Sequence, residues 1–119
     1  MGGTLENTTS KPTFFFSAQA DANDSNQFIS AIQIIKYSFD NDDSVSEIIT
    51  LHESSDAYDL DLDKCEVNGP KQKNFCGVWR DENHTPNMEA SYYLRVISAP
   101  TCRWSHQLCM ENDNYCEKD

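Results

Sequence analysis

Hydrophobic and polar positions alternate with a period of two along most of this chain, which is the pattern of half-buried β-strands. Residues 12–20 place two phenylalanines and an alanine on one side and predict a first strand. Residues 28–39 and 45–53 flank an Asp- and Asn-rich turn and predict an antiparallel hairpin. Helical spacing also occurs within residues 28–39, but their β-branched side chains favour a strand. A short strand is expected around Trp79.

The stretch from residue 90 to residue 109, ASYYLRVISAPTCRWSHQLC, joins a predicted strand to a segment rich in reactive and aromatic side chains. Pro100 ends the strand, because proline cannot donate to a sheet ladder. Two cysteines, an arginine, a tryptophan and a histidine follow, and residues 104–110 are expected to form one or two helical turns. This segment either presents a surface site on a stapled loop or only locks the end of the strand. We favour the second interpretation.

The predicted fold class is mainly β, with a small antiparallel sheet or sandwich of about five to six strands and irregular, disulfide-stapled loops. Residues 1–11 are expected to be an irregular lead-in, residues 12–110 a single β-rich domain and residues 111–119 an acidic tail. The tail is expected to be ordered only if Cys116 is paired.

The charge balance excludes some partners. Twenty acidic residues face nine basic ones, and the net charge of -11 argues against nucleic acid and anionic membranes, which both attract basic patches. No apolar window is long enough for a membrane span. Asp59, Asp61 and Asp63 alternate with leucines, so they are either a weak calcium candidate or the charged face of an edge strand. The edge strand is favoured.

Five cysteines in a small acidic chain favour an oxidising compartment, so a periplasmic or extracellular location is expected. The spacings suit two local disulfides, Cys65 with Cys76 and Cys102 with Cys109. Sequence alone does not fix connectivity, and Cys116 competes with Cys102 for Cys109. A zinc site is not expected, because the chain has no CxxC-type pair.

No catalytic motif accompanies these cysteines. The three histidines form no HxH or HExxH arrangement, and the chain has no GxSxG sequence or glycine-rich phosphate loop. The residues by themselves therefore indicate a binding or structural domain, with no catalytic residues assigned and no cofactor expected in this chain.

Four stretches in a fixed order resemble one known family. They read MGGTL at residues 1–5, IQIIKY at residues 32–37, VWRDE at residues 78–82, and YYLRV followed by PTCRWS within residues 92–105. Together they resemble the C-terminal part of the domain of unknown function 3604 family of large bacterial proteins. The chain departs from the family pattern at Thr4, where an acidic residue is usual, at Tyr37, and at residues 98–99.

The resemblance implies a larger protein, because the family is similar to PHP-type metal-dependent hydrolases with an amidohydrolase-like β/α barrel. The barrel and its divalent metal would lie upstream of Met1, so the chain is expected to be an accessory β region with that barrel as its partner. Gly2, Gly3, Arg103 and Trp104 are the candidate residues that face the barrel or the edge of its site, and ordinary structural packing is the favoured alternative for them. The alternative is an independent secreted, disulfide-stapled binding module, with calcium held by Asp59, Asp61 and Asp63.

Overall fold

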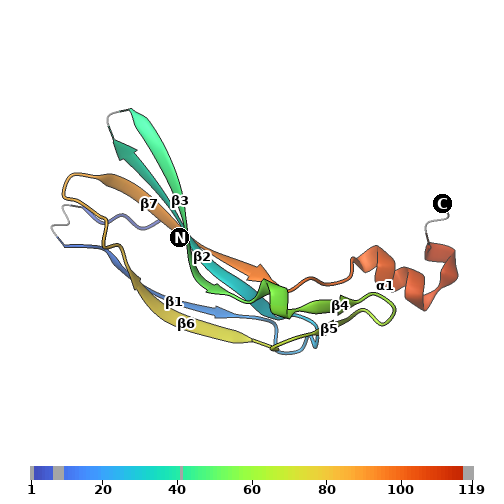
Figure 1. Ribbon diagram of the computed structural model, residues 1–119. Coiled ribbons are helices and arrows are strands. Elements are labelled where there is room, and N and C mark those ends of the chain that lie inside the picture. Colours follow the sequence, from blue (N-terminus) through green and yellow to red (C-terminus); the bar gives the residue numbers. More distant parts are fainter. Residues whose placement is uncertain (1, 7–9, 41, 117–119) are drawn as a thin grey trace.

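Strand β2 (Ile29–Asp40) is the centre of the larger sheet, because it pairs with a neighbour on each side. The computed structural model describes residues 2–6, 10–40 and 42–116 of the chain. Strand β3 (Asp43–Glu53) returns antiparallel to β2 after a tight turn, as the hydrophobic pattern predicts. Strand β7 (Glu89–Ser98) pairs antiparallel with the other edge of β2 (Figure 1). The β-branched run of β2 is therefore buried between two neighbours.

A second, two-stranded sheet lies against the first. Strand β1 (Thr13–Gln19) pairs antiparallel with β6 (Asn74–Arg80). The alternating residues Phe14, Phe16 and Ala18 face the larger sheet. Phe16 and Ala18 belong to the core cluster that also contains Ile32 and Leu94 of the larger sheet. Burial of these apolar side chains holds the two sheets together.

A small hairpin extends one end of the molecule. Strands β4 (Asp59–Asp61) and β5 (Glu66–Asn68) form it, after a single 3₁₀ turn, η1 (Ser55–Ala57). Its base is fixed by a second core cluster of Phe28, Tyr58, Val67 and Ala99. The predicted acidic strand is therefore shorter than its alternation suggests, because the chain first turns at η1 and turns again after Asp61.

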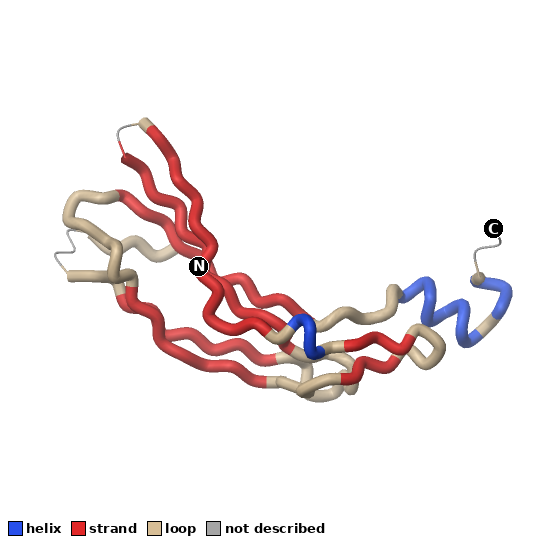
Figure 2. The backbone as a smooth tube through the Cα atoms, viewed as in Figure 1, coloured by secondary structure: helices blue, strands red, loops and turns tan. Residues whose placement is uncertain are grey.

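The described part of the chain ends with helix α1 (Trp104–Glu111) and a 3₁₀ turn, η2 (Asp113–Tyr115), beyond the β4–β5 hairpin (Figure 2). Over the described ranges the structure has seven strands, so the predicted mainly β class is confirmed. The molecule is long and narrow, with extents of 60 × 29 × 24 Å. No helix in the described part of the chain is long and apolar enough to cross a membrane.

The disulfides differ from the predicted local staples. Cys65 pairs with Cys102, Cys109 pairs with Cys116, and Cys76 is an exposed free thiol. Cys76 lies on β6 opposite Ser17 of β1, whereas Cys65 ends the turn of the β4–β5 hairpin. These two residues belong to different sheets, so the short spacing between them does not bring their thiols together.

Candidate functional site

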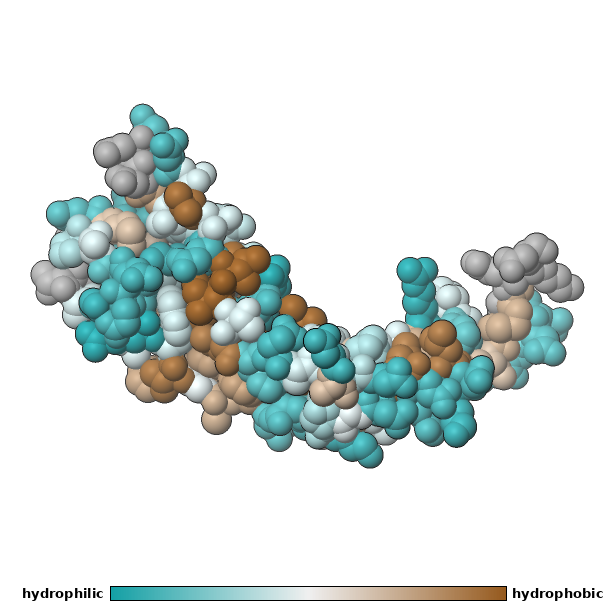
Figure 3. Space-filling view, viewed as in Figure 1, coloured by the Kyte–Doolittle hydropathy of each residue, from teal (hydrophilic) through white to brown (hydrophobic). Residues whose placement is uncertain are grey.

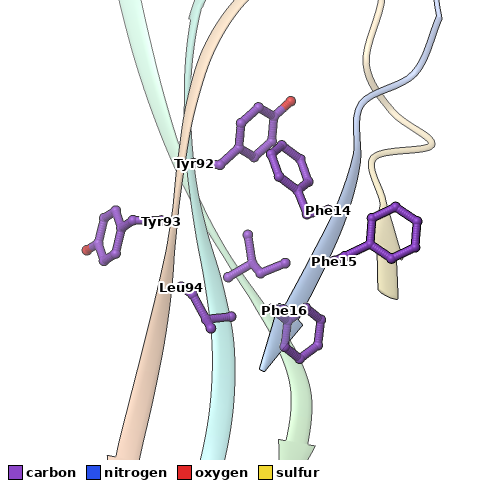
Figure 4. Close-up of a pocket in the computed structure, with 7 residues that line it drawn as sticks. Phe14, Phe15, Phe16, Tyr92, Tyr93 and Leu94 are labelled. Carbon is purple, nitrogen blue, oxygen red and sulfur yellow. The ribbon is translucent and has the colours of Figure 1, made fainter. Parts of the chain in front are cut away.

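An aromatic pocket lies between the two sheets. It has a volume of about 150 Å³ and its walls come from β1, β2 and β7. Phe14 and Tyr92 point toward one another across the gap, with ring centroids 4.8 Å apart (Figure 4). Phe15 and Tyr93 point away from this contact, on the opposite sides of their strands (Figure 4). The remaining wall residues are Phe16, Ile34 and Leu94.

A buried ion pair is linked to the aromatic pocket through Tyr92. The Lys36 ammonium lies 2.6 Å from Oδ2 of Asp81, and only 5% and 2% of the two side chains are exposed. The Tyr92 hydroxyl donates a hydrogen bond of 2.6 Å to the same carboxylate oxygen. The Asn83 backbone N–H donates to Oδ1 of Asp81 at 3.1 Å. Each carboxylate oxygen therefore has a partner, as a buried charge requires.

This environment keeps Asp81 ionised. Burial opposes its ionisation, but the hydrogen bonds from Lys36 and Tyr92 outweigh that effect, so the pKa of Asp81 lies below its usual value. Burial raises the pKa of Tyr92, and the neighbouring Asp81 carboxylate raises it further. Tyr92 thus stays a protonated donor at physiological pH. The group is a saturated polar cluster that ties β2, β7 and the end of β6 together.

The predicted barrel-facing residues are all exposed. Trp104 opens α1 with 73% of its surface accessible, and Arg103 caps the same helix through its carbonyl, which accepts from the His106 and Gln107 N–H groups. Gly2 and Gly3 lie in open space, since a Cβ atom added at either residue would meet no other atom within 4 Å. These four residues are accessible to a partner, but the structure does not bring them together in one site.

The three aspartates of the calcium alternative do not gather. Oδ1 of Asp61 accepts hydrogen bonds from the Asp63 and Lys64 backbone N–H groups, which is a turn-forming role. In the described residues one group of three His, Cys, Asp or Glu side chains has ligand atoms within 4.8 Å of one another, and it consists of Cys65, Cys102 and His106. The acidic segment therefore acts as a turn and a charged hairpin edge.

The comparison with protein families identifies the kinship of the chain. A family model described as a protein of unknown function (DUF3604) matches residues 1–119. The chain belongs to the DUF3604 family. Neither the curated proteins nor the solved structures include a match to it.

The polar cluster of this DUF3604 chain was not foreseen from the sequence, although its members come from three of the stretches that carry the resemblance. Lys36 ends IQIIK, Asp81 lies in VWRD, and Tyr92 begins YYLRV. The available signal was the phase of Lys36, which lies two and four residues after the inward-facing Ile34 and Ile32. A lysine in the buried phase of a strand requires an anionic partner.

Proposed function

We propose that this chain is an accessory β region that packs against a catalytic β/α barrel of a metal-dependent hydrolase-like protein and does not hydrolyse substrate by itself. The observation that carries the proposal is its extended shape. The radius of gyration is 19.5 Å, whereas a compact domain of this length has about 13–14 Å. In so extended a chain several large apolar side chains on the outer sheet faces stay exposed, among them Phe15, Ile48 and Phe39, which is what a layer built to lie on another domain requires.

The outer face of the β3–β2–β7 sheet is the proposed contact surface. Ile48 and Tyr93 lie on either side of Ile35 in one row across the three strands; Ile35 itself is buried, whereas Ile48 and Tyr93 are exposed. The ring of Tyr93 stacks with that of Tyr37 at 6.3 Å, and Phe39 continues the same face along β2. Of these, Ile48 and Phe39 are more than half exposed. Brown apolar patches are visible on the part of the surface that the strands form in the space-filling view (Figure 3).

The chemistry of this face suits a protein surface. Its polar members include the small side chains of Ser46 and Ser91 and the carboxylate of Glu89 opposite Phe39. The guanidinium of Arg95 donates two hydrogen bonds to Oε1 of Gln33. A face that combines exposed apolar side chains with polar groups is typical of an interface between domains of one chain. Gly2, Gly3, Arg103 and Trp104 remain candidates for further contacts with the barrel, which would hold the divalent metal.

The experiment compares the chain alone with a longer form that includes whatever coding sequence precedes it in its gene. We expect the longer form to hold a divalent metal and to hydrolyse a test phosphoester or ester, and the chain alone to do neither. Tyr93→Asp should lower the melting temperature of the longer form by several degrees and leave the chain alone nearly unchanged. Val78→Asp is the matched control, because Val78 is also exposed but lies on the outer face of the other sheet.

A hydrolytically active isolated chain would overturn the proposal, and so would equal responses to Tyr93→Asp and Val78→Asp in the longer form. The second candidate function, an independent secreted binding module, is favoured by the two disulfides, which are compatible with an oxidising compartment. It predicts an isolated chain that is monomeric, unfolds cooperatively and is stabilised by a ligand such as calcium.

A further inference from the structure

Four soft or borderline metal-ligand side chains meet where helix α1 lies beside the tip of the β4–β5 hairpin (Figure 1). The ligand atoms of Cys65, Cys102 and His106 lie within 4.8 Å of one another. The Met110 thioether sulfur is 3.2 Å from Sγ of Cys65. His106 and Met110 are four residues apart on α1 and therefore project from one face of the helix.

We propose that this cluster is a redox-gated binding site for Cu(I). In the oxidised form the two sulfurs are joined as the Cys65–Cys102 disulfide and offer no thiolate. A dithiol reductant opens the site: it transfers two electrons and two protons to the disulfide, gives two cysteine thiols and becomes a disulfide itself. Cu(I) then replaces the two thiol protons, which leave to solvent, and is held by two thiolates, an imidazole and a thioether.

The ligand set selects the metal. Thiolate and thioether sulfurs are the ligands that Cu(I) prefers, whereas zinc sites are built from cysteine, histidine and carboxylate. Met110 is thus the residue that distinguishes the two metals. It is also close to half exposed, and His106 is exposed, so two of the four ligand residues are accessible to solvent.

His106 is held in place by a second contact. Its Nε2 lies 2.9 Å from the carbonyl oxygen of Leu62, in the turn that leads to Cys65. A neutral imidazole that donates from Nε2 to this carbonyl leaves Nδ1 free as a ligand, which is the usual arrangement of a metal-binding histidine. The same contact fastens α1 to the hairpin, so the helix carries its two ligands to the cysteines.

The test uses the full chain in a Cys76→Ser/Cys109→Ser/Cys116→Ser background, so that only the proposed cysteine pair can bind metal. After anaerobic reduction with a phosphine, Cu(I) is titrated in competition with a chromophoric Cu(I) chelator. We expect one Cu(I) per reduced chain and none per oxidised chain. Met110→Leu and His106→Gln should each weaken binding at least about tenfold, and X-ray absorption should report sulfur and nitrogen neighbours around the copper.

Met88→Leu is the matched control, because Met88 lies in the loop before β7 and is not part of the cluster. If Met110→Leu and His106→Gln bind Cu(I) as tightly as Met88→Leu, the two thiols act without the helix and the proposal is overturned. It is also overturned if stoichiometric Zn(II) displaces the bound Cu(I). Circular dichroism of each variant before titration separates loss of a ligand from loss of the fold.

Discussion

The ammonium group of Lys36 and the carboxylate of Asp81 meet at 2.6 Å, with both side chains almost wholly buried between the sheets. Removal of one partner leaves the other charge without compensation in a poorly solvated place. Lys36→Met and Asp81→Ala should therefore each lower the free energy of unfolding by about 3–5 kcal/mol. Urea denaturation followed by circular dichroism measures both losses.

The double variant Lys36→Met/Asp81→Ala separates the ion pair from simple loss of packing. It should lose less stability than the sum of the two single variants, because neither charge is then left unpaired. Strictly additive losses would contradict a direct interaction between the two side chains.

Acidification should remove the contribution of Asp81. The pKa of Asp81 is lower in the folded chain than in the unfolded chain, where an aspartate has a pKa of about 3.9. The stabilisation is therefore fully present above about pH 4 and is lost as the pH falls through the lower folded value. Unfolding free energies measured from pH 6 down to pH 2 should decrease less steeply in Asp81→Asn than in the parent chain.

Glu82→Gln is the control for this pH dependence. Hydrogen bonding to Lys11 lowers the pKa of Glu82 as well, but Glu82 is exposed and its ion pairs are open to salt. Its effect on the pH profile should be smaller and should shrink in 0.5 M salt, on the scale of a short screening length. An equal, salt-sensitive effect of Asp81→Asn would contradict the burial of the Lys36–Asp81 pair.

The disulfide pairs differ in expected stabilising effect, because they close loops of different length. The Cys65–Cys102 bond spans 37 residues and the Cys109–Cys116 bond spans 7. Loop-closure entropy gives about 4 kcal/mol for the first and about 2.5 kcal/mol for the second. Cys65→Ser/Cys102→Ser should therefore lower the melting temperature more than Cys109→Ser/Cys116→Ser does.

Peptide mapping of the unreduced protein checks the connectivity itself. The Cys65 peptide should be linked to the Cys102 peptide, and a thiol reagent should label Cys76 alone. A peptide that links Cys65 to Cys76 would contradict the structure.

Gly77 supports the ring of Phe16 across the two-stranded sheet, where the two residues are direct partners. A Cβ atom at Gly77 would lie 2.8 Å from the end of that ring. Gly77→Ala should destabilise the protein by about 1–3 kcal/mol, because the ring must move in a packed core. Thermal unfolding of Gly77→Ala and of Gly3→Ala makes the comparison, since open space surrounds Gly3; equal melting temperatures would contradict the packing of Phe16.

The long strands could be predicted because their signals are local. In β1 the alternation of Phe14, Phe16 and Ala18 marks the buried face, and in β2 and β3 the turn residues between two β-branched runs mark a hairpin. The disulfides could not be predicted in the same way, because the partner of Cys65 depends on where β7 delivers Cys102. That position is set by strand order and not by spacing along the chain.

The polar cluster of Lys36, Asp81 and Tyr92 could be predicted only in part. The position of Lys36 among the buried residues of β2 is a local signal, but no nearby residue indicates that Asp81 is its partner. The pairing arises because β1 and β6 pack over β2 and place the end of β6 above Lys36. The cluster of metal-ligand side chains formed by His106 and Met110 with Cys65 could not be predicted from the sequence for the same reason, since it depends on how α1 meets the hairpin.

The strand order also sets the sequence of events during synthesis. β1 can pair only after β6 has been made, and the two strands are separated by the 54 residues between Gln19 and Asn74. At ordinary rates of translation this is a delay of about 3–11 s. During that time the phenylalanine-rich β1 has no partner strand, whereas β2 and β3 can already form their hairpin. Folding of this protein is therefore expected to be slow and dependent on late contacts, and newly made chains are most exposed to aggregation through β1.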